Sequence, residues 1–407
     1  MVEYLTPDTL GYRSPSLSWS IAGDTSGSTQ PPRTSARPGA TGRYHVVGRT
    51  ILDPEGYAFI PRGVNVGAGI ENNGNGWPDL SENGPYIDGQ KAFGCTAVRI
   101  VQYATSRQPW SVRGKAIAAG KTEAQANAEV DAVVDRLTRT YRNKGMVVIM
   151  ECHDLTQDTG SYQSAPGHAW RTRELTANGR KWMSEVVDFW RRYASRWKHD
   201  SGVWFNIANE PNLDQEDWHT LHREACEVIR YGANQADNII VLDAMYYASD
   251  LTRDFWARPI PRGFESHMFP QYVAKYQNIV GSQHNYGSHN TYINQAAVSA
   301  YYDEYVNAEV PLMVGEVGFP VAGQVANSGS RQNERDGAYW SMEEAISRGI
   351  GVFWWASAFN DAYRLYDVAA NNSPIKNEFD GVTELNEAGL MFKSYLTRSK
   401  ATDPVRP

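Results

Sequence analysis

Between residues 95 and 210 the chain repeats one pattern, in which a short apolar run is followed by a long amphipathic segment. The apolar runs are CTAVRIVQ (95–102), MVVIMECH (146–153) and VWFNIANE (203–210), and the segments between them are AQANAEVDAVVDRLTRTYRNKG (124–145) and GRKWMSEVVDFWRRYASRWKHD (179–200). Continuously apolar runs are typical of parallel strands that are covered on both faces. The helical period of the longer segments predicts the helices that cover them.

The same alternation extends in both directions along the chain. Further strands are predicted at FIPRGVNV (59–66), NIIVLDAM (238–245), IVGSQHNY (279–286), VPLMVGEV (310–317) and GVFWWASA (351–358), and further helices at residues 214–237, 293–309, 333–349 and 385–399. Eight strands that alternate with helices predict an α/β fold of the (β/α)8 TIM-barrel type. A doubly wound open sheet is the competing fold, but the turn after the first strand, NVGAGIENNGNGWP, carries no GxGxxG motif.

The first 42 residues differ in composition from the rest of the chain. Residues 24–42, DTSGSTQPPRTSARPGATG, consist mostly of Ser, Thr, Gly and Pro. Such a stretch is typical of a linker, because it buries too little apolar surface to offset its ordering entropy. We therefore expect an N-terminal extension over residues 1–42 and one barrel domain over residues 43–407. No basic segment followed by an apolar stretch opens the chain, so no signal peptide is recognisable.

Composition argues against several classes of protein. The 407 residues are 41% hydrophobic and 21% charged, as in a globular protein with a sizeable core. A total of 39 basic and 46 acidic residues gives a net charge of −7, which argues against a nucleic-acid partner. No run of 18 apolar residues is present, which argues against a membrane-spanning segment. Cys95, Cys152 and Cys226 are widely spaced, which argues against a disulfide framework or a structural zinc site.

Polar side chains stand at the carboxyl end of almost every predicted strand, which is where (β/α)8 barrels build their active sites. Two of them are carboxylates, Glu210 on the fourth strand and Glu316 on the seventh, which places them on opposing walls of the barrel. Facing carboxylates suit glycoside hydrolysis, in which one protonates the leaving oxygen and the other attacks the sugar or activates water. The alternative is a buried glutamate that pairs with a barrel arginine for stability. The other residues at these ends include Arg99, His153, Asn209, His284, Tyr286 and Trp355.

The order of these residues resembles glycoside hydrolase family 5, the family of cellulases and β-mannanases. The matching positions, within roughly residues 43–400, are Arg99, His153, Asn209-Glu210-Pro211, His284-x-Tyr286, Glu316 in GEVGF and a terminal Trp. The resemblance implies a retaining β-glycoside hydrolase with Glu210 as general acid/base and Glu316 as nucleophile. Both steps are proton transfer and carboxylate displacement, so we expect no cofactor and no metal ion.

The resemblance also implies roles for the neighbouring residues. Arg99 and the Tyr286 hydroxyl are expected beside Glu316, where they favour its charged form and lower its pKa, whereas Glu210 lacks such a cation. Asn209 is expected to bind the sugar 2-hydroxyl, and His153 and His284 to orient the polar groups around the sugar. Trp355 is expected to stack on the sugar in the −1 subsite, while its neighbour Trp354 packs against helices. Candidates for outer subsites are Trp77, Trp110 and Trp170.

Substrate signals conflict. ECHD (151–154) resembles the mannanase branch of the family and IANEPN (207–212) the cellulase branch. We expect an endo-β-1,4-glucanase. The alternatives are a β-1,4-mannanase, an exo-acting β-glycosidase whose cleft is walled by the loop 360–381 with Tyr363 and Tyr366, and a transglycosylase. From another class, the alternative is a carbohydrate-binding adhesion protein attached through its first 42 residues. We expect a monomer that acts outside the cell on a polysaccharide or oligosaccharide, with no nucleic-acid or membrane partner.

Overall fold

The computed structural model describes the greater part of the barrel domain. The described residues are 39–67, 85–105, 111–153, 162–164, 173–175, 177–211, 213, 215–244, 248, 272–287, 294–326, 330–356, 362–366 and 385–405. The chain divides into residues 1–36 and 37–407, and all the described residues belong to the second part. The predicted linker lies almost entirely outside the described residues, so the division at residue 42 stays a prediction.

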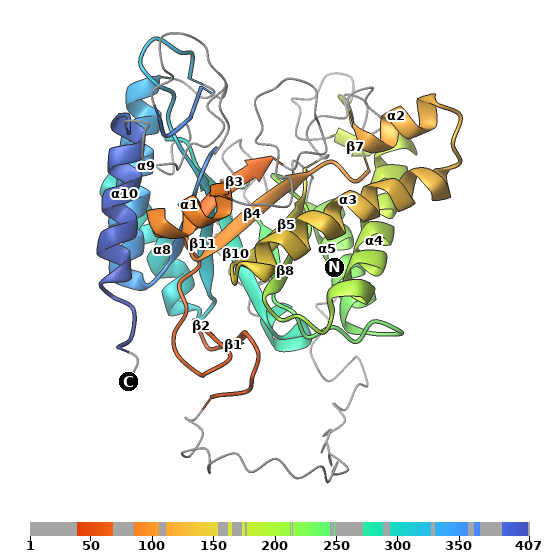
Figure 1. Cartoon of the computed structure of the whole chain (residues 1–407), viewed down its shortest axis with the longest axis horizontal. Coiled ribbons are helices and arrows are strands. Elements are labelled where there is room, and N and C mark those ends of the chain that lie inside the picture. The colour runs from red at the N-terminus through yellow and green to blue at the C-terminus, as the bar shows by residue number, and fades with distance from the viewer. Residues whose placement is uncertain are drawn as a thin grey trace, which may run out of the picture. The chain divides into compact units, whose positions relative to one another are not determined.

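Eight parallel strands close into a barrel (Figure 1). In barrel order they are β3 (Gly63–Gly67), β4 (Ala97–Gln102), β5 (Val147–Cys152), β8 (Val203–Asn206), β9 (Ile240–Asp243), β10 (Ile279–Asn285), β11 (Leu312–Val317) and β12 (Gly351–Trp354). Phe353 and Trp354 of β12 pair with Gly63 and Val64 of β3 to complete the ring. Each barrel strand coincides with a predicted run, so the (β/α)8 prediction is confirmed. Because the strands are parallel, their carboxyl ends form one mouth of the barrel.

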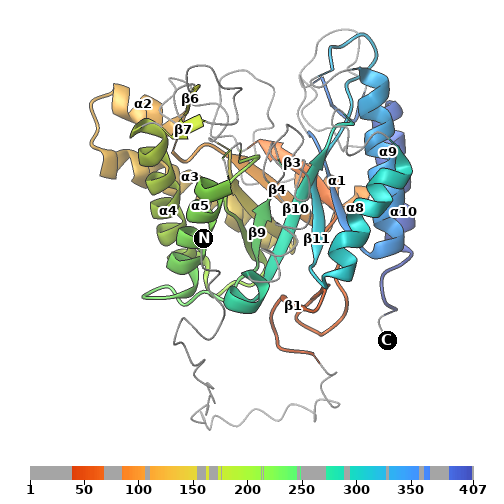
Figure 2. The ribbon, with the colours of Figure 1, turned by 180° about the vertical axis from the view of Figure 1, so that it is seen from behind.

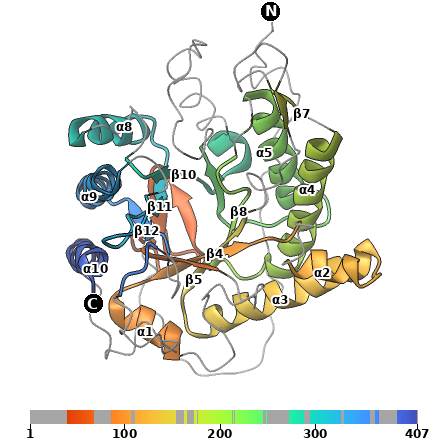
Figure 3. The ribbon, with the colours of Figure 1, turned by 90° about the horizontal axis from the view of Figure 1, so that it is seen from above.

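Helices surround the strands, as Figure 3 shows from above. They are α1 (Pro85–Phe93), α2 (Val112–Ala118), α3 (Glu123–Asn143), α4 (Ala177–Trp197), α5 (Gln215–Arg230), α8 (Gln295–Asn307), α9 (Arg331–Arg348) and α10 (Glu387–Lys400). The last six overlap the predicted helices, whereas α1 and α2 are missed because nine and seven residues are too few for a clear helical period. Among the described residues, no helix has the length and apolar character needed to cross a bilayer.

Helix ends follow local sequence signals. Thr122 caps the amino end of α3 and forms a capping box with Gln125, in which each side chain satisfies a backbone N–H of the other residue. Ser330 caps α9 by accepting from the N–H of Asn333, and Gly349 ends it in the left-handed conformation at φ 67°. These signals set the amino ends of α3 and α9 and the carboxyl end of α9.

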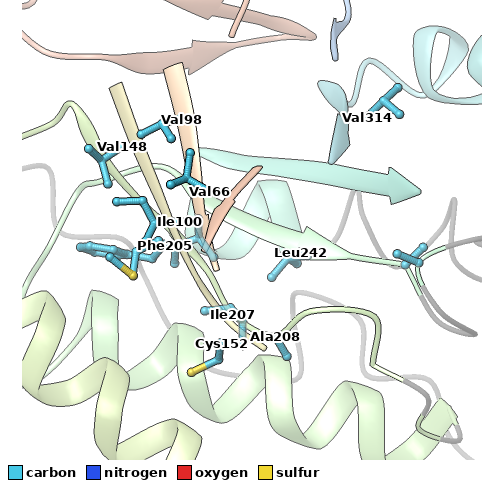
Figure 4. Packing of buried hydrophobic residues seen from close by; sticks show 14 of the residues in the cluster. Val66, Val98, Ile100, Val148, Cys152, Phe205, Ile207, Ala208, Leu242 and Val314 are labelled. Atoms are coloured by element: carbon cyan, nitrogen blue, oxygen red, sulfur yellow. The ribbon is translucent and has the colours of Figure 1, made fainter. Parts of the chain in front are cut away.

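Strand side chains alternate between two apolar cores. Val148 and Met150 of β5 face outward and pack against the helices, and Figure 4 shows this outer core around Val98, Val148 and Phe205. Val147 and Ile149 of the same strand belong instead to the core inside the barrel. This alternation explains the continuously apolar runs, since both faces of each strand are buried.

A hairpin of β1 (His45–Val47) and β2 (Thr50–Leu52) packs against the core inside the barrel, at the end away from the mouth (Figure 2). Tyr44 and Phe59 lie with their ring centroids 6.2 and 6.0 Å from that of Trp204, in edge-to-face contacts. A second hairpin, β6 (Tyr162–Ser164) and β7 (Arg173–Leu175), follows β5. The sequence does not predict either hairpin, because strands of three residues carry too short a pattern.

Candidate active site

Inside the barrel, side chains change from apolar to polar toward the mouth. Every second residue of a barrel strand faces the interior. In β5 this series runs from Val147 and Ile149, in the apolar core, to Glu151 at the polar end. The equivalent changes are from Ala97 to Arg99 in β4, from Trp204 to Asn206 in β8, from Val241 to Asp243 in β9 and from Val280 to His284 in β10.

The structure brings the eight predicted site residues together at this polar end. Four of them form one hydrogen-bonded network, Glu210 and His284 form a pair that Asp243 joins to it, and the other two stack on each other beside it. The contacts are Arg99 with Glu316 and Asn209, Tyr286 with Glu316, His284 with Glu210, and His153 with Trp355.

Arg99 is the buried cation at the centre of this network. Its Nη1 donates to Oε1 of Glu316 at 2.8 Å, and its Nη2 donates to Oδ1 of Asn209 at 2.8 Å. A guanidinium that uses its planar fork in this way is held rigidly and orients both partners. The nearby carboxylates outweigh the burial of Arg99 and raise its pKa, so it stays charged. Its remaining contacts are with Asn65, Asn206 and Asp243.

Glu316 has the two partners that the sequence predicts. Besides the ion pair with Arg99, its Oε2 accepts a hydrogen bond of 2.8 Å from the hydroxyl of Tyr286. Burial nevertheless raises the pKa of Glu316 to about 6, because the loss of water outweighs the lowering by Arg99, His153 and Tyr286. The predicted net lowering of this pKa is therefore wrong, although the predicted contacts are present. Sequence spacing carries no information on how deeply the carboxylate is buried.

Glu210 follows β8 in an unusual backbone conformation and contacts a different set of groups. Its φ is 44°, in the left-handed region that non-glycine residues seldom adopt. Its Oε1 lies 2.9 Å from Nδ1 of His284, and 20% of its side chain remains exposed. Burial, followed by repulsion from Glu316, raises its pKa well above the ordinary value. Because Arg99 hydrogen-bonds Glu316 and not Glu210, we expect Glu316 to ionise first.

The two carboxylates are close to each other. Glu210, His284 and Glu316 each present one oxygen or nitrogen atom within 4.8 Å of the others. Among the described residues, this is the group whose ligand atoms lie close enough together to hold a metal ion. Arg99 already neutralises Glu316, however, and would repel a second cation. We therefore interpret the group as a close carboxylate pair.

His153 and Trp355 form one side of the site. Nδ1 of His153 lies 2.8 Å from Oε1 of the buried Glu151, which outweighs burial and raises the pKa of the imidazole. Trp355 stacks on His153 with ring centroids 5.6 Å apart and an angle of 12° between the planes. Trp354 is fully buried, donates from Nε1 to the carbonyl of Tyr363 at 2.8 Å, and packs on Phe392 of α10. The two tryptophans thus lie as the strand alternation predicts.

Several buried polar residues of the site are missed from the sequence. Their signal is available, since each is a polar residue within two positions of the carboxyl end of an apolar strand. Asn65 lies next to Arg99 in the register of β3 and β4, and its Nδ2 donates to the carbonyls of Gly315 and Trp354. The others are Glu151, Asn206 and Asp243.

Two expectations about the loops stay predictions. Tyr363 and Tyr366 are buried; the Tyr363 hydroxyl donates to Oε2 of Glu334 at 2.6 Å, and its ring lies edge-on to that of Tyr286 with centroids 6.0 Å apart. Most of the loop 360–381 lies outside the described residues, so its place as a wall of the cleft stays a prediction. The predicted outer-subsite residues Trp77, Trp110 and Trp170 lie outside the described residues.

Comparisons with known proteins agree with this geometry. Residues 53–361 match the family model "Cellulase (glycosyl hydrolase family 5)". Endoglucanase A of Butyrivibrio fibrisolvens is 21% identical over 315 residues, which are 77% of this chain and 60% of that protein. A mannan endo-1,4-beta-mannosidase of Cellvibrio japonicus is 24% identical over 79% of this chain and 61% of its own length. The chain therefore spans about 60% of the length of these relatives.

Solved structures share the fold. The catalytic domain of Thermobifida fusca endoglucanase Cel5A superposes with a TM-score of 0.59 at 18% identity, covering 88% of this chain and 97% of that one. The catalytic domain of a mannanase from Streptomyces sp. SirexAA-E gives a TM-score of 0.56 at 19% identity, covering 90% and 94%. Since the family model covers most of the barrel and the site residues occur in the expected order, the chain belongs to glycoside hydrolase family 5.

Proposed function

We propose that the chain is a retaining β-glycoside hydrolase in which Glu210 is the general acid/base and Glu316 the nucleophile. The observation that carries the proposal is the carboxylate pair, with an oxygen of each within 4.8 Å and a cation on Glu316 alone. Retaining enzymes hold their carboxyl groups about 5–5.5 Å apart, and inverting enzymes about 6.5–9.5 Å, to leave room for water.

The proposed reaction has two displacements. In the first, ionised Glu316 attacks the anomeric carbon while protonated Glu210 gives its proton to the leaving oxygen. In the second, ionised Glu210 takes a proton from water, whose oxygen attacks the same carbon and releases Glu316. Oδ1 of Asn209 is held by Arg99, so its Nδ2 is the atom available to bind the sugar 2-hydroxyl. Trp355, fixed by His153, offers a flat face for the sugar ring.

We further propose a β-1,4-glucan as substrate, with a β-1,4-mannan as the second candidate. An endoglucanase and a mannosidase are both among the relatives, which supports these two polymers and does not separate them. Reducing-sugar release from carboxymethyl-cellulose and from galactomannan tests the choice directly. Binding of either polymer without turnover by the folded protein would favour the adhesion alternative instead.

Two variants test the assigned roles. Glu316→Ala should abolish turnover. Glu210→Ala should lose about 10²–10⁴-fold on polysaccharide, and much less on a 2,4-dinitrophenyl glycoside, whose leaving group needs no proton. Added azide should give a β-glycosyl azide with Glu210→Ala and an α-glycosyl azide with Glu316→Ala, because it enters from opposite faces of the sugar. Glu343→Ala, which removes a surface partner of Arg398, is the matched control and should keep full activity. The opposite pair of azide products would reverse the two roles.

A further inference from the structure

Asp243 is a buried carboxylate that the proposed reaction leaves without a role. It ends β9, and its Oδ2 lies 3.2 Å from Nη2 of Arg99 and accepts from the backbone N–H of Glu210 at 3.2 Å. Its Oδ1 accepts from Nδ2 of Asn206 at 2.9 Å. Burial raises the pKa of Asp243, and Arg99 opposes this rise. Because these neighbours are all hydrogen-bond donors, the group is best satisfied as a carboxylate.

His284 lies between Asp243 and Glu210. Its Nδ1 is 2.9 Å from Oε1 of Glu210, and its Nε2 is 3.4 Å from Oδ2 of Asp243, an ion-pair distance rather than a well-aligned hydrogen bond. Burial, followed by Arg99 and His153, lowers the pKa of His284 well below its ordinary value, so the ring is neutral. A neutral imidazole has one N–H and one lone pair to offer.

Counting protons shows which state of Glu210 this arrangement favours. When Glu210 is protonated, its O–H donates to Nδ1 of His284, and the single ring proton on Nε2 faces Asp243. When Glu210 is ionised, either tautomer of the ring turns a lone pair toward a carboxylate, on Glu210 or on Asp243. The ring therefore satisfies both neighbours only while Glu210 holds a proton.

We propose that Asp243 is a positioning residue that, through His284, keeps the proton on Glu210 for the first displacement. The inference rests on the proposed function, since it assigns the source of the acid in that reaction. After Glu210 has given its proton to the leaving oxygen, its ionised oxygen faces the Nδ1 lone pair. This contact favours taking a proton back from water in the second displacement. The backbone hydrogen bond from Glu210 to Asp243 also holds the left-handed conformation of Glu210.

Other charged groups face the same pair and remain when Asp243 is changed. Glu316 from β11 raises the pKa of Glu210 more than Asp243 does, and Arg99 from β4 lowers it. Oε2 of Glu316 also lies 3.5 Å from Nδ1 of His284, and this contact is the same in both protonation states of Glu210. Glu151 in β5 adds a smaller effect in the raising direction, and the adjacent His153 acts on the ring of His284. Asp243 also acts on Glu210 directly through its charge and hydrogen-bonds Arg99. The part that runs through His284 is therefore measured by comparing Asp243→Asn with His284→Gln and with the double variant.

The test is the pH dependence of Asp243→Asn, with two readouts. We expect the alkaline limb of kcat/KM on 4-nitrophenyl β-cellobioside or β-mannobioside to move to lower pH by about one unit, a tenfold change in proton affinity. NMR titration of the ¹³C-labelled Glu210 carboxyl should shift in the same direction, and it needs no turnover. We also expect the variant to lose more on the 4-nitrophenyl than on the 2,4-dinitrophenyl glycoside. An equal loss on both, with both titrations unmoved, would assign Asp243 a merely structural role and overturn the proposal.

Glu151→Gln is the matched control, because it removes a buried carboxylate that contacts His153 and not His284. Its titration should move much less, and an equal shift would mean a general charge effect. His284→Gln should move the limb as Asp243→Asn does, with no further shift in the double variant. If Asp243→Asn fails to fold, ¹⁵N NMR of the wild-type protein decides, since an Nδ1–H tautomer of His284 beside protonated Glu210 overturns the proposal. A wild-type protein inactive on every glycoside would instead count against the proposed function, while the NMR result on His284 would still stand.

Discussion

Replacing Arg99 with methionine should destabilise the protein by an amount that depends on pH. Removing one partner of a buried ion pair costs about 3–5 kcal/mol. In this variant Glu316 and Asp243 lose the cation that they share, and each can bind a proton instead of remaining a buried, uncompensated charge. Since the pKa of Glu316 is about 6, protonating it at pH 7 accounts for at most about 1.4 kcal/mol of the destabilisation, at 1.36 kcal/mol per pKa unit. Protonating Asp243 at pH 7 accounts for at most about 4 kcal/mol of the destabilisation, starting from an ordinary pKa of about 3.9.

The destabilisation caused by Arg99→Met should be smaller at low pH than at neutral pH. Without Arg99 the folded-state pKa values of both carboxyl groups rise further, and a raised carboxyl pKa lowers stability as the pH rises. At pH 5 Glu316 is already protonated and Asp243 contributes at most about 1.5 kcal/mol. The difference in free energy of unfolding between wild type and Arg99→Met should therefore be about 3–5 kcal/mol at pH 7 and should narrow by about 2–4 kcal/mol at pH 5.

Urea denaturation followed by circular dichroism at the two pH values measures this difference. The matched control is Arg398→Met, which removes a surface guanidinium that is 47% exposed and pairs with Glu343 through two contacts of 2.6 Å. That change should cost at most about 1 kcal/mol, because exposed ion pairs are screened by water. If Arg99→Met costs no more than the control at pH 7, or costs the same at both pH values, the account of Arg99 as the charge partner of two buried carboxylates is refuted.

Three more outcomes are expected. The kcat/KM of the wild type should rise as the pH passes about 6, where Glu316 ionises, and should fall at higher pH, where Glu210 loses its proton; a profile without an acid limb near pH 6 contradicts this assignment. Gly315→Ala should lower thermal stability by about 1–3 kcal/mol and reduce activity, because an added Cβ would lie 2.6 Å from Oγ of Ser282 and 2.7 Å from Nε2 of His284. A wild-type melting temperature would show that these atoms yield easily. Trp204→Ala should cost about 3–5 kcal/mol but leave the pH profile unchanged, because Trp204 lies in the apolar core inside the barrel and packs against Tyr44 and Phe59; a shifted profile would contradict that separation from the charged groups.

The barrel and the eight candidate site residues are predictable from the amino-acid sequence alone. Parallel strands buried on both faces need continuous apolar runs, so segments such as MVVIMECH and VPLMVGEV identify the strands and their direction. A polar residue at the end of such a run, like Glu210 or Glu316, then belongs at the mouth, because parallel strands all end there. Trp354 and Trp355 are separated by the same reasoning, since successive side chains point to opposite faces.

Burial and contacts across the barrel are not predictable in this way. Arg99 on β4 and Asp243 on β9 are separated by two strands in the barrel order, and only the closed ring brings Nη2 to 3.2 Å from Oδ2. The raised pKa of Glu316 has the same origin, because desolvation depends on the atoms that surround a group on all sides. Chain order thus determines which residues reach the mouth, through the period of a strand and the direction of a parallel sheet. Packing of eight strands into one ring determines where their protons reside, because electrostatic interaction depends on distance and on access to water.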